Sequence, residues 1–107
     1  MTVRTVRVRT RRTFAIARGA ADVFERVVLE VSAGGHSGLG EAAPTRYYGQ
    51  DAPSVAAALR EAEVPDPWDI EGALALNERL PPSGLSALDA ALHDLAARRL
   101  GVPVYRL

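Results

Sequence analysis

Arginine supplies all 13 basic side chains of this 107-residue chain. Because lysine is absent, the chain has no Schiff-base lysine and no phosphate-loop lysine. Cysteine is absent too, which excludes disulfides, zinc–thiolate sites and thiol nucleophiles. The two histidines alone cannot build an all-histidine metal site. These absences remove several kinds of covalent and metal-assisted chemistry from the chain.

Arg18 is the first candidate for a ligand contact. It follows the apolar residues 14–17 and precedes Gly19, so it stands at the mouth of a loop where its guanidinium could clamp a carboxylate. An ordinary surface arginine is the alternative. Tyr47 and Tyr48 lie in a second, polar loop, where one ring can pack and the other can face a ligand.

Two further polar features favour structural roles. Five arginines between Arg4 and Arg12 alternate mainly with apolar residues, a pattern typical of the solvated face of an edge strand; a phosphate-binding stripe is the alternative. Glu41 ends a glycine-rich segment, where its carboxylate could reach a ligand or loop amides. We expect it to accept hydrogen bonds and to order the next loop.

The remaining histidines and paired acids carry weaker signals. His36 and His93 have no second ligand at a metal-binding spacing, so we expect surface or helix-capping roles. Asp89 and Asp94 lie five residues apart and should not share a helix face. The sequence therefore gives little support to an acid pair for general acid–base catalysis.

Three strands are predicted in the first 43 or so residues. Val6 and Val8 alternate with arginines, which predicts one buried valine face and one wet arginine face. A second strand is predicted over 24–31, and a small-residue turn at 33–35 leads to a third over 36–43. Two glycines inside the third strand indicate a bulge or the close approach of another backbone.

Helical patterns follow from residue 51 onward. Asp51 or Ser54 can cap a helix that runs to about Glu63. Asp66 and the proline after it predict a second helix to about Leu80, stopped by the two following prolines.

The last helix has the clearest pattern, with leucines spaced three, four and three residues apart. Two arginines and Gly101 predict its end, with the glycine as a left-handed C-cap. The leucines are Leu85, Leu88, Leu92 and Leu95.

Strands followed by helices, with no visible linker or repeat, predict one α+β domain. The chain is too short to contain a (β/α)8 barrel, which needs roughly 200 residues. Its net charge of zero argues against nucleic-acid binding, and its scattered helix arginines make no basic groove. With no signal-peptide core or membrane-spanning run, we expect a cytoplasmic protein that does not bind membranes.

Four segments together resemble the N-terminal capping domain of the enolase superfamily. Within it the chain is most similar to the muconate-lactonizing branch and to dipeptide epimerases of the L-Ala-D/L-Glu type. The segments are RTFAIARG at 12–19, VVLEV at 27–31, GLGEAAPTRYYGQ at 38–50 and SALDAALHDLAARRLGVPVYRL at 86–107. The resemblance implies a three-stranded antiparallel meander followed by a helical part, with residues 1–107 forming the lid over a barrel.

The resemblance also implies where the chemistry lies. In this family a Mg²⁺ ion held by three carboxylates of the barrel stabilises an enediolate, and lysines of the barrel remove and return the α-proton. None of these groups is expected here, so this chain alone should bind no cofactor and contain no catalytic residue.

The family's lid shapes the substrate pocket with two loops, which correspond to 16–22 and 45–50. The residues implied to contact a dipeptide are Ile16, Arg18, Gly19, Thr45, Arg46, Tyr47 and Tyr48. Arg18 matches the arginine that pairs with the acidic side chain of the dipeptide. The second loop reads TRYYGQ where many relatives have a form closer to PRYGE, so Gln50 stands in place of an acid.

Other functions remain open at this point. The lid could belong to a muconate cycloisomerase, an o-succinylbenzoate synthase or a racemase of the same branch, and the parent could be a homo-oligomer. From a different class, the chain could be a free-standing interaction module.

Overall fold

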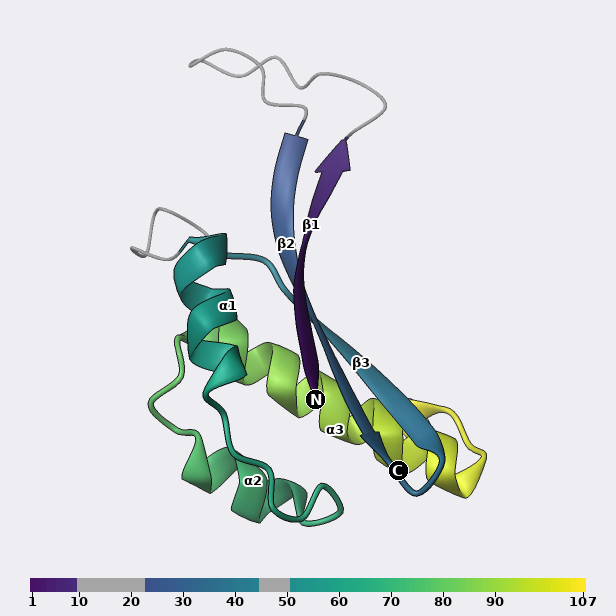
Figure 1. The fold of residues 1–107 in the computed structure, drawn as a ribbon. Helices are drawn as coiled ribbons and strands as arrows, with labels where there is room; N and C mark the ends of the chain where they lie inside the picture. Colours follow the sequence, from purple (N-terminus) through teal and green to yellow (C-terminus); the bar gives the residue numbers. More distant parts are fainter. Residues whose placement is uncertain (10–22, 45–50) are drawn as a thin grey trace.

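The structure is a computed structural model that describes residues 1–9, 23–44 and 51–107. Strands β1 (Thr2–Arg9), β2 (Val23–Ala33) and β3 (His36–Ala42) form an antiparallel sheet in the order β1-β2-β3. Helices α1 (Ala52–Arg60), α2 (Ile70–Leu76) and α3 (Pro82–Leu100) follow, and a 3₁₀ turn, η2 (Val104–Arg106), comes after them. Figure 1 shows the long α3 lying across the sheet. The predicted α+β class and meander are confirmed.

The turn between β2 and β3 contains two glycines with positive φ. Gly34 has a φ of 58° and Gly35 a φ of 79°, values that residues with a Cβ rarely adopt. Two consecutive left-handed residues match the tight connection whose twist suits an antiparallel hairpin. The predicted turn is confirmed.

The core face of the sheet is formed by alternate residues of β2 and β3. Val27, Leu29 and Val31 are at most 4% exposed. The predicted close approach at the strand glycines is also confirmed, because a Cβ on Gly40 would overlap the carbonyl oxygen of Ala87, and one on Gly38 that of Ala91. At Gly38 and Gly40, strand β3 therefore lies directly against the backbone of α3.

Strand β1 exists as predicted, but the face assigned to Val6 was wrong; the side chain of Val8 lies outside the described residues. Val6, expected to be buried, is 36% exposed, whereas Val3 packs against the core. The register pairs Val3 with Leu29 and Thr5 with Val27, so Val3 and Thr5 lie on the face of the sheet that the helices cover. A period of two identifies two faces but does not say which one the helices will cover.

Helix α1 ends at Arg60, short of the predicted Glu63. Asp51 is the N-cap, and its carboxylate accepts a 2.8 Å hydrogen bond from the amide of Ser54. At the other end the amide of Ala62 donates to the carbonyl of Leu59, a shorter-range bond that closes the helix. The helical hydrogen bonds do not continue to Glu63 because the backbone of Glu63 is bonded to the side chain of Asn77.

Asn77 provides those bonds and also ends α2 before the predicted Leu80. Its Nδ2 donates to the carbonyls of Glu63 and Ala73 at 2.8 and 2.7 Å, and its Oδ1 accepts from the amide of Glu63 at 3.1 Å. Asn77 is the C-cap of α2 and only 8% exposed. One buried side chain thus joins the end of α2 to the connection after α1.

The start of α2 also differs from the prediction. Asp69, not Asp66, caps it by accepting a 3.0 Å hydrogen bond from the amide of Gly72. Asp66 instead accepts from the amide of Trp68 in the preceding turn. Two acids three residues apart offered two possible caps, and the later one is used.

Helix α3 begins at Pro82, a residue that we expected to stop the preceding helix. Proline is tolerated there because the first amides of a helix have no partner within it. Leu88, Leu92 and Leu95 are fully buried, while Leu85 is only half-buried. Gly101 has a φ of 70° and caps the helix as predicted.

Candidate functional site

The residues implied to contact substrate lie in two segments that the structure does not describe. The first segment is 10–22, which contains the loop 16–22, and the second is 45–50. The placement of these residues is therefore untested. The structure describes only the residues that flank each segment, which we call its anchors. The set is Ile16, Arg18, Gly19, Thr45, Arg46, Tyr47 and Tyr48.

The anchors of both segments lie at the same end of the sheet. Arg9 and Val23, which flank the first segment, are cross-strand partners at the end of the β1–β2 ladder. Ala42, close before the second segment, pairs with Val27, four residues along β2 from Val23. At about 3.3 Å per residue, the anchors are separated by roughly 13 Å along the strand. The glycine turn occupies the opposite end of the β2–β3 hairpin (Figure 1).

The start of α1, which follows segment 45–50 in the chain, is fixed by its N-cap and by core packing. Besides its bond to the Ser54 amide, the Asp51 carboxylate lies 2.8 Å from the Ser54 hydroxyl. Buried Ala52 and Val55 then tie the first turn of α1 to the core. An N-cap of this type contributes on the order of 1 kcal/mol to helix stability.

An ion pair joins β2 and β3 near these anchors. Nε of Arg26 lies 3.4 Å from Oε1 of Glu41, and the side chains are 29% and 59% exposed. Both residues are on the face of the sheet opposite the helices, since Glu41 pairs with Val28 in the ladder. We expected the Glu41 carboxylate to order the following loop, whereas its described partner is a neighbouring strand.

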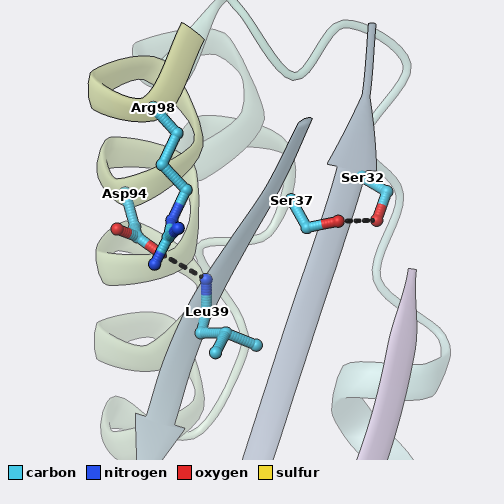
Figure 2. A network of polar contacts seen from close by, with 5 residues as sticks. All are labelled: Ser32, Ser37, Leu39, Asp94 and Arg98. Atoms are coloured by element: carbon cyan, nitrogen blue, oxygen red, sulfur yellow. Dashed lines mark hydrogen bonds and ion pairs between the residues drawn. The ribbon is translucent and has the colours of Figure 1, made fainter. Parts of the chain in front are cut away.

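A shallow groove runs along α3 beside β3. Asp94 lines it and accepts a 2.8 Å hydrogen bond from the amide of Leu39, on the outer edge of β3, and a 3.2 Å bond from Nε of Arg98 (Figure 2). Between β2 and β3, the hydroxyls of Ser32 and Ser37 lie 2.7 Å apart. The groove lining comprises Leu39, Ser86, Asp89, Ala90, His93, Asp94, Arg98 and Val104.

Asp89 and Asp94 border this one groove, although we expected them on separate faces of the helix. Nδ1 of His93 lies 2.8 Å from Oδ1 of Asp89 and 2.9 Å from the Asp89 carbonyl oxygen. The two carboxylates thus have different partners, a histidine for Asp89 and a strand amide and an arginine for Asp94. As expected, His93 has a helix-surface role, and His36 is half-buried on β3.

At the edges of the sheet, charged side chains have roles that the sequence analysis did not predict. Asp94 covers the amide of Leu39 on one edge of the sheet, and Nη2 of Arg60 donates a 3.3 Å hydrogen bond to the carbonyl of Val3 on the other. Free edge groups invite pairing with another chain, so such contacts protect the sheet. The sequence signal that could have predicted the Asp94 contact was an acid on the polar side of the last helix, together with the glycine-rich strand at 36–42.

The described residues do not fit a metal centre. No group of three or more histidine or acidic side chains within the described ranges could hold a metal ion. The Mg²⁺ implied by the resemblance thus finds no ligand set there. Separately, none of the helices in the described ranges is long and apolar enough to cross a membrane.

The meander and the helical layer define an α+β domain. The model for the N-terminal domain of mandelate racemase and muconate lactonizing enzymes matches residues 1–107. The chain belongs to this family.

Its similar proteins include several dipeptide epimerases. It is 32% identical to a hydrophobic dipeptide epimerase of Roseobacter litoralis over 96% of the chain and 31% of that protein. It is 40% identical to the L-Ala-D/L-Glu epimerase of Escherichia coli K12 over 80% of the chain and 27% of that protein. The chain therefore spans about a third or less of the relatives' length.

A solved structure agrees with these relatives. The dipeptide epimerase of Methylococcus capsulatus, complexed with Mg and the dipeptide L-Arg-D-Lys, superposes with a TM-score of 0.77 and 32% identity. The match covers 98% of this chain and 32% of that one. The predicted fold and family are thus confirmed, and the homologous enzyme binds Mg and a dipeptide.

Proposed function

We propose that this chain is the lid domain of a Mg²⁺-dependent dipeptide epimerase. The observation that carries the proposal is the common placement of the two segment anchors at one end of the sheet. Two segments whose anchors lie on neighbouring strands of one scaffold can both contact one bound molecule. Family membership and the dipeptide epimerases among its relatives supply the substrate class.

In this proposal the chain binds and encloses the substrate but moves no proton. It has no lysine, and its described residues offer no metal site. Mg²⁺ would stabilise the enolate formed next to the substrate carboxylate, and its ligands would belong to a barrel domain outside this chain. The purified 107-residue chain should therefore not exchange the α-proton of any dipeptide with deuterated water, with or without Mg²⁺.

The relatives favour two different specificities. One acts on hydrophobic dipeptides and another on L-Ala-D/L-Glu. We favour an acidic dipeptide here because Arg18, in the segment AIARG, offers the planar fork that binds a carboxylate through two parallel hydrogen bonds. Specificity for an apolar dipeptide, with Arg18 at the surface, is the second candidate. A muconate cycloisomerase, an o-succinylbenzoate synthase or another racemase is a third.

Substitution of Arg18 in the full-length protein tests the proposal. Charge-assisted hydrogen bonds contribute about 1.5 to 3 kcal/mol, so Arg18→Ala should lower kcat/KM for dipeptides ending in glutamate or aspartate roughly tenfold to a hundredfold. Dipeptides ending in an apolar residue should be much less affected, and Mg²⁺ binding should not change. Arg18→Lys should recover only part of the loss, since an ammonium cannot form the bidentate pair.

Arg7→Ala is the matched control, because Arg7 is another arginine near the same end of the sheet and its side chain is 77% exposed. It should leave both substrate classes unchanged. If Arg18→Ala reduces activity toward acidic and apolar dipeptides by the same factor, Arg18 has a structural role and the apolar alternative is favoured.

A further inference from the structure

We propose that residues 61–80 form a strap that opens and closes as one unit, and that stacking of Arg99 on Trp68 holds it closed. The strap is the part of the chain between α1 and Pro81, and it contains α2. The proposal is independent of the proposed function, since it uses no substrate contact.

The hydrogen bonds of the strap hold it together from within. Asn77 bonds to both backbone groups of Glu63 and to the carbonyl of Ala73, so the two ends of the strap are joined to each other. Asp69 caps α2 by accepting from the amide of Gly72. All of these bonds connect residues of the strap with one another. They fix its shape but do not attach it to the rest of the domain.

The strap is attached to the core by less buried surface than the other helices are. Helix α2 has one buried residue, Ala73, whereas α1 has four and α3 has seven, and Figure 1 shows α2 at the edge of the domain. The partly buried apolar residues that add to this contact are Val64, Ile70, Leu74 and Leu80. A helix of seven residues is too short to persist alone in water. Release of the strap and melting of α2 should therefore be one event.

Trp68 is the residue through which the strap contacts two distant parts of the chain. The guanidinium carbon of Arg99, in the last turn of α3, lies 4.2 Å from the centroid of the indole ring, within the range of a cation–π contact. A Cβ on Gly34 would lie 3.4 Å from Cζ2 of the ring, so the ring also lies against the turn between β2 and β3. Trp68 thus joins the strap to the sheet and to α3.

The backbone around Trp68 couples this contact to α2. The amide of Trp68 donates a 3.0 Å hydrogen bond to the Asp66 carboxylate, and the amide of Asp69 donates a 3.2 Å bond to the Asp66 carbonyl. Asp69 is itself the N-cap of α2. A tight turn therefore connects the stacked ring directly to the start of the helix, and loss of the stack should loosen the whole strap.

Arg98 provides a matched control for Arg99. Both arginines lie in the last turn of α3, where a positive charge interacts favourably with the helix dipole. Nε of Arg98, however, lies 3.2 Å from the carboxylate of Asp94. Replacing either arginine with glutamine removes the same charge from the same turn, but only Arg99→Gln removes the contact with the indole ring.

Hydrogen–deuterium exchange in the full-length protein tests the proposal. Arg99→Gln should accelerate exchange of the strap amides by a common factor of about twofold to fivefold, the size expected from losing a partly exposed cation–π contact. Arg98→Gln should leave their exchange unchanged. The amides to follow, each bonded to an acceptor inside the strap, are those of Glu63, Ala73 and Leu80.

Two further variants separate the stack from other effects of the substitution. Arg99→Lys keeps a cation over the ring and should recover most of the change. In a Trp68→Leu background, Arg99→Gln should have almost no additional effect, because the two side chains act through one contact. Equal exchange in Arg99→Gln and Arg98→Gln, acceleration confined to one of the three amides, or an undiminished effect without the ring would each overturn the inference.

Discussion

The two ends of the sheet differ sharply in how they are packed. Around β3 the core-facing positions are filled, with Val27 and Leu29 fully buried against the helices. Farther along the same face, where β1 and β2 run past β3, the side chains of Arg7 and Glu25 are 77% and 43% exposed. One continuous β2 strand thus belongs to a tightly packed region at one end and an open one at the other.

This difference distinguishes the residues that stabilise the fold from the strand ends that flank segment 10–22. In the packed region, Gly38 and Gly40 lie on the backbone of α3, a contact that leaves no room for a Cβ atom. The open end anchors segment 10–22 through Arg9 and Val23, whereas Ala42, close before segment 45–50, is buried beside Val27 at the edge of the packed region. Binding segments carried on a rigid scaffold can vary without loss of the fold. Substitutions at the packed end should therefore affect folding most.

The largest effect is expected at Gly40. Gly40→Ala places a methyl group against the carbonyl of Ala87, so α3 and β3 must separate, at a cost of about 3 kcal/mol in unfolding free energy. Urea denaturation measures the loss. Gly35→Ala is the control, since it strains a positive φ in open space and should cost only about 1 kcal/mol. Equal losses would mean that backbone conformation, and not the close approach, requires glycine in β3.

A smaller effect should distinguish the two faces of the sheet. Val27→Thr buries a hydroxyl in an apolar core and should destabilise the chain by about 2 kcal/mol. Val6→Thr, on the face without helices, should change stability by less than about 0.5 kcal/mol. Thermal and urea unfolding of the two variants provide the comparison. A large loss for Val6→Thr would show that this face is covered in the folded protein.

The smallest effect is expected at the protected edge of β3. Asp94→Ala removes the acceptor for the Leu39 amide and should cost about 1 kcal/mol. Asp94→Asn keeps an oxygen acceptor and should lose less. Unfolding measurements give the stability, and faster amide exchange at Leu39 in the alanine variant would identify the edge as the affected site. Unchanged exchange there would argue that the bond does not protect the strand.

Several local features were predicted correctly because neighbouring residues decide them. The glycine turn between β2 and β3, the Asp51 cap and the Gly101 C-cap each depend on residues within a few positions. The buried face of α3 was also recognised, since leucines repeated at helical spacing specify it.

The candidate site was predictable only in part. The resemblance named the two segments, but the Arg26–Glu41 pair escaped notice because the two residues lie on different strands. Their contact follows from the register that sets Val28 opposite Glu41. Register depends on the turn and on the buried pattern together.

The sequence by itself determined the order of the elements, the turn chemistry and the apolar stripe of α3, all set by bonds that span about four residues. Tertiary structure decided which face of β1 is buried and where α1 and α2 end. Asn77 joins Glu63 from 14 positions away, and Asp94 reaches the amide of Leu39 across 55. Such contacts form only after the chain has brought distant residues together, so no local pattern can specify them.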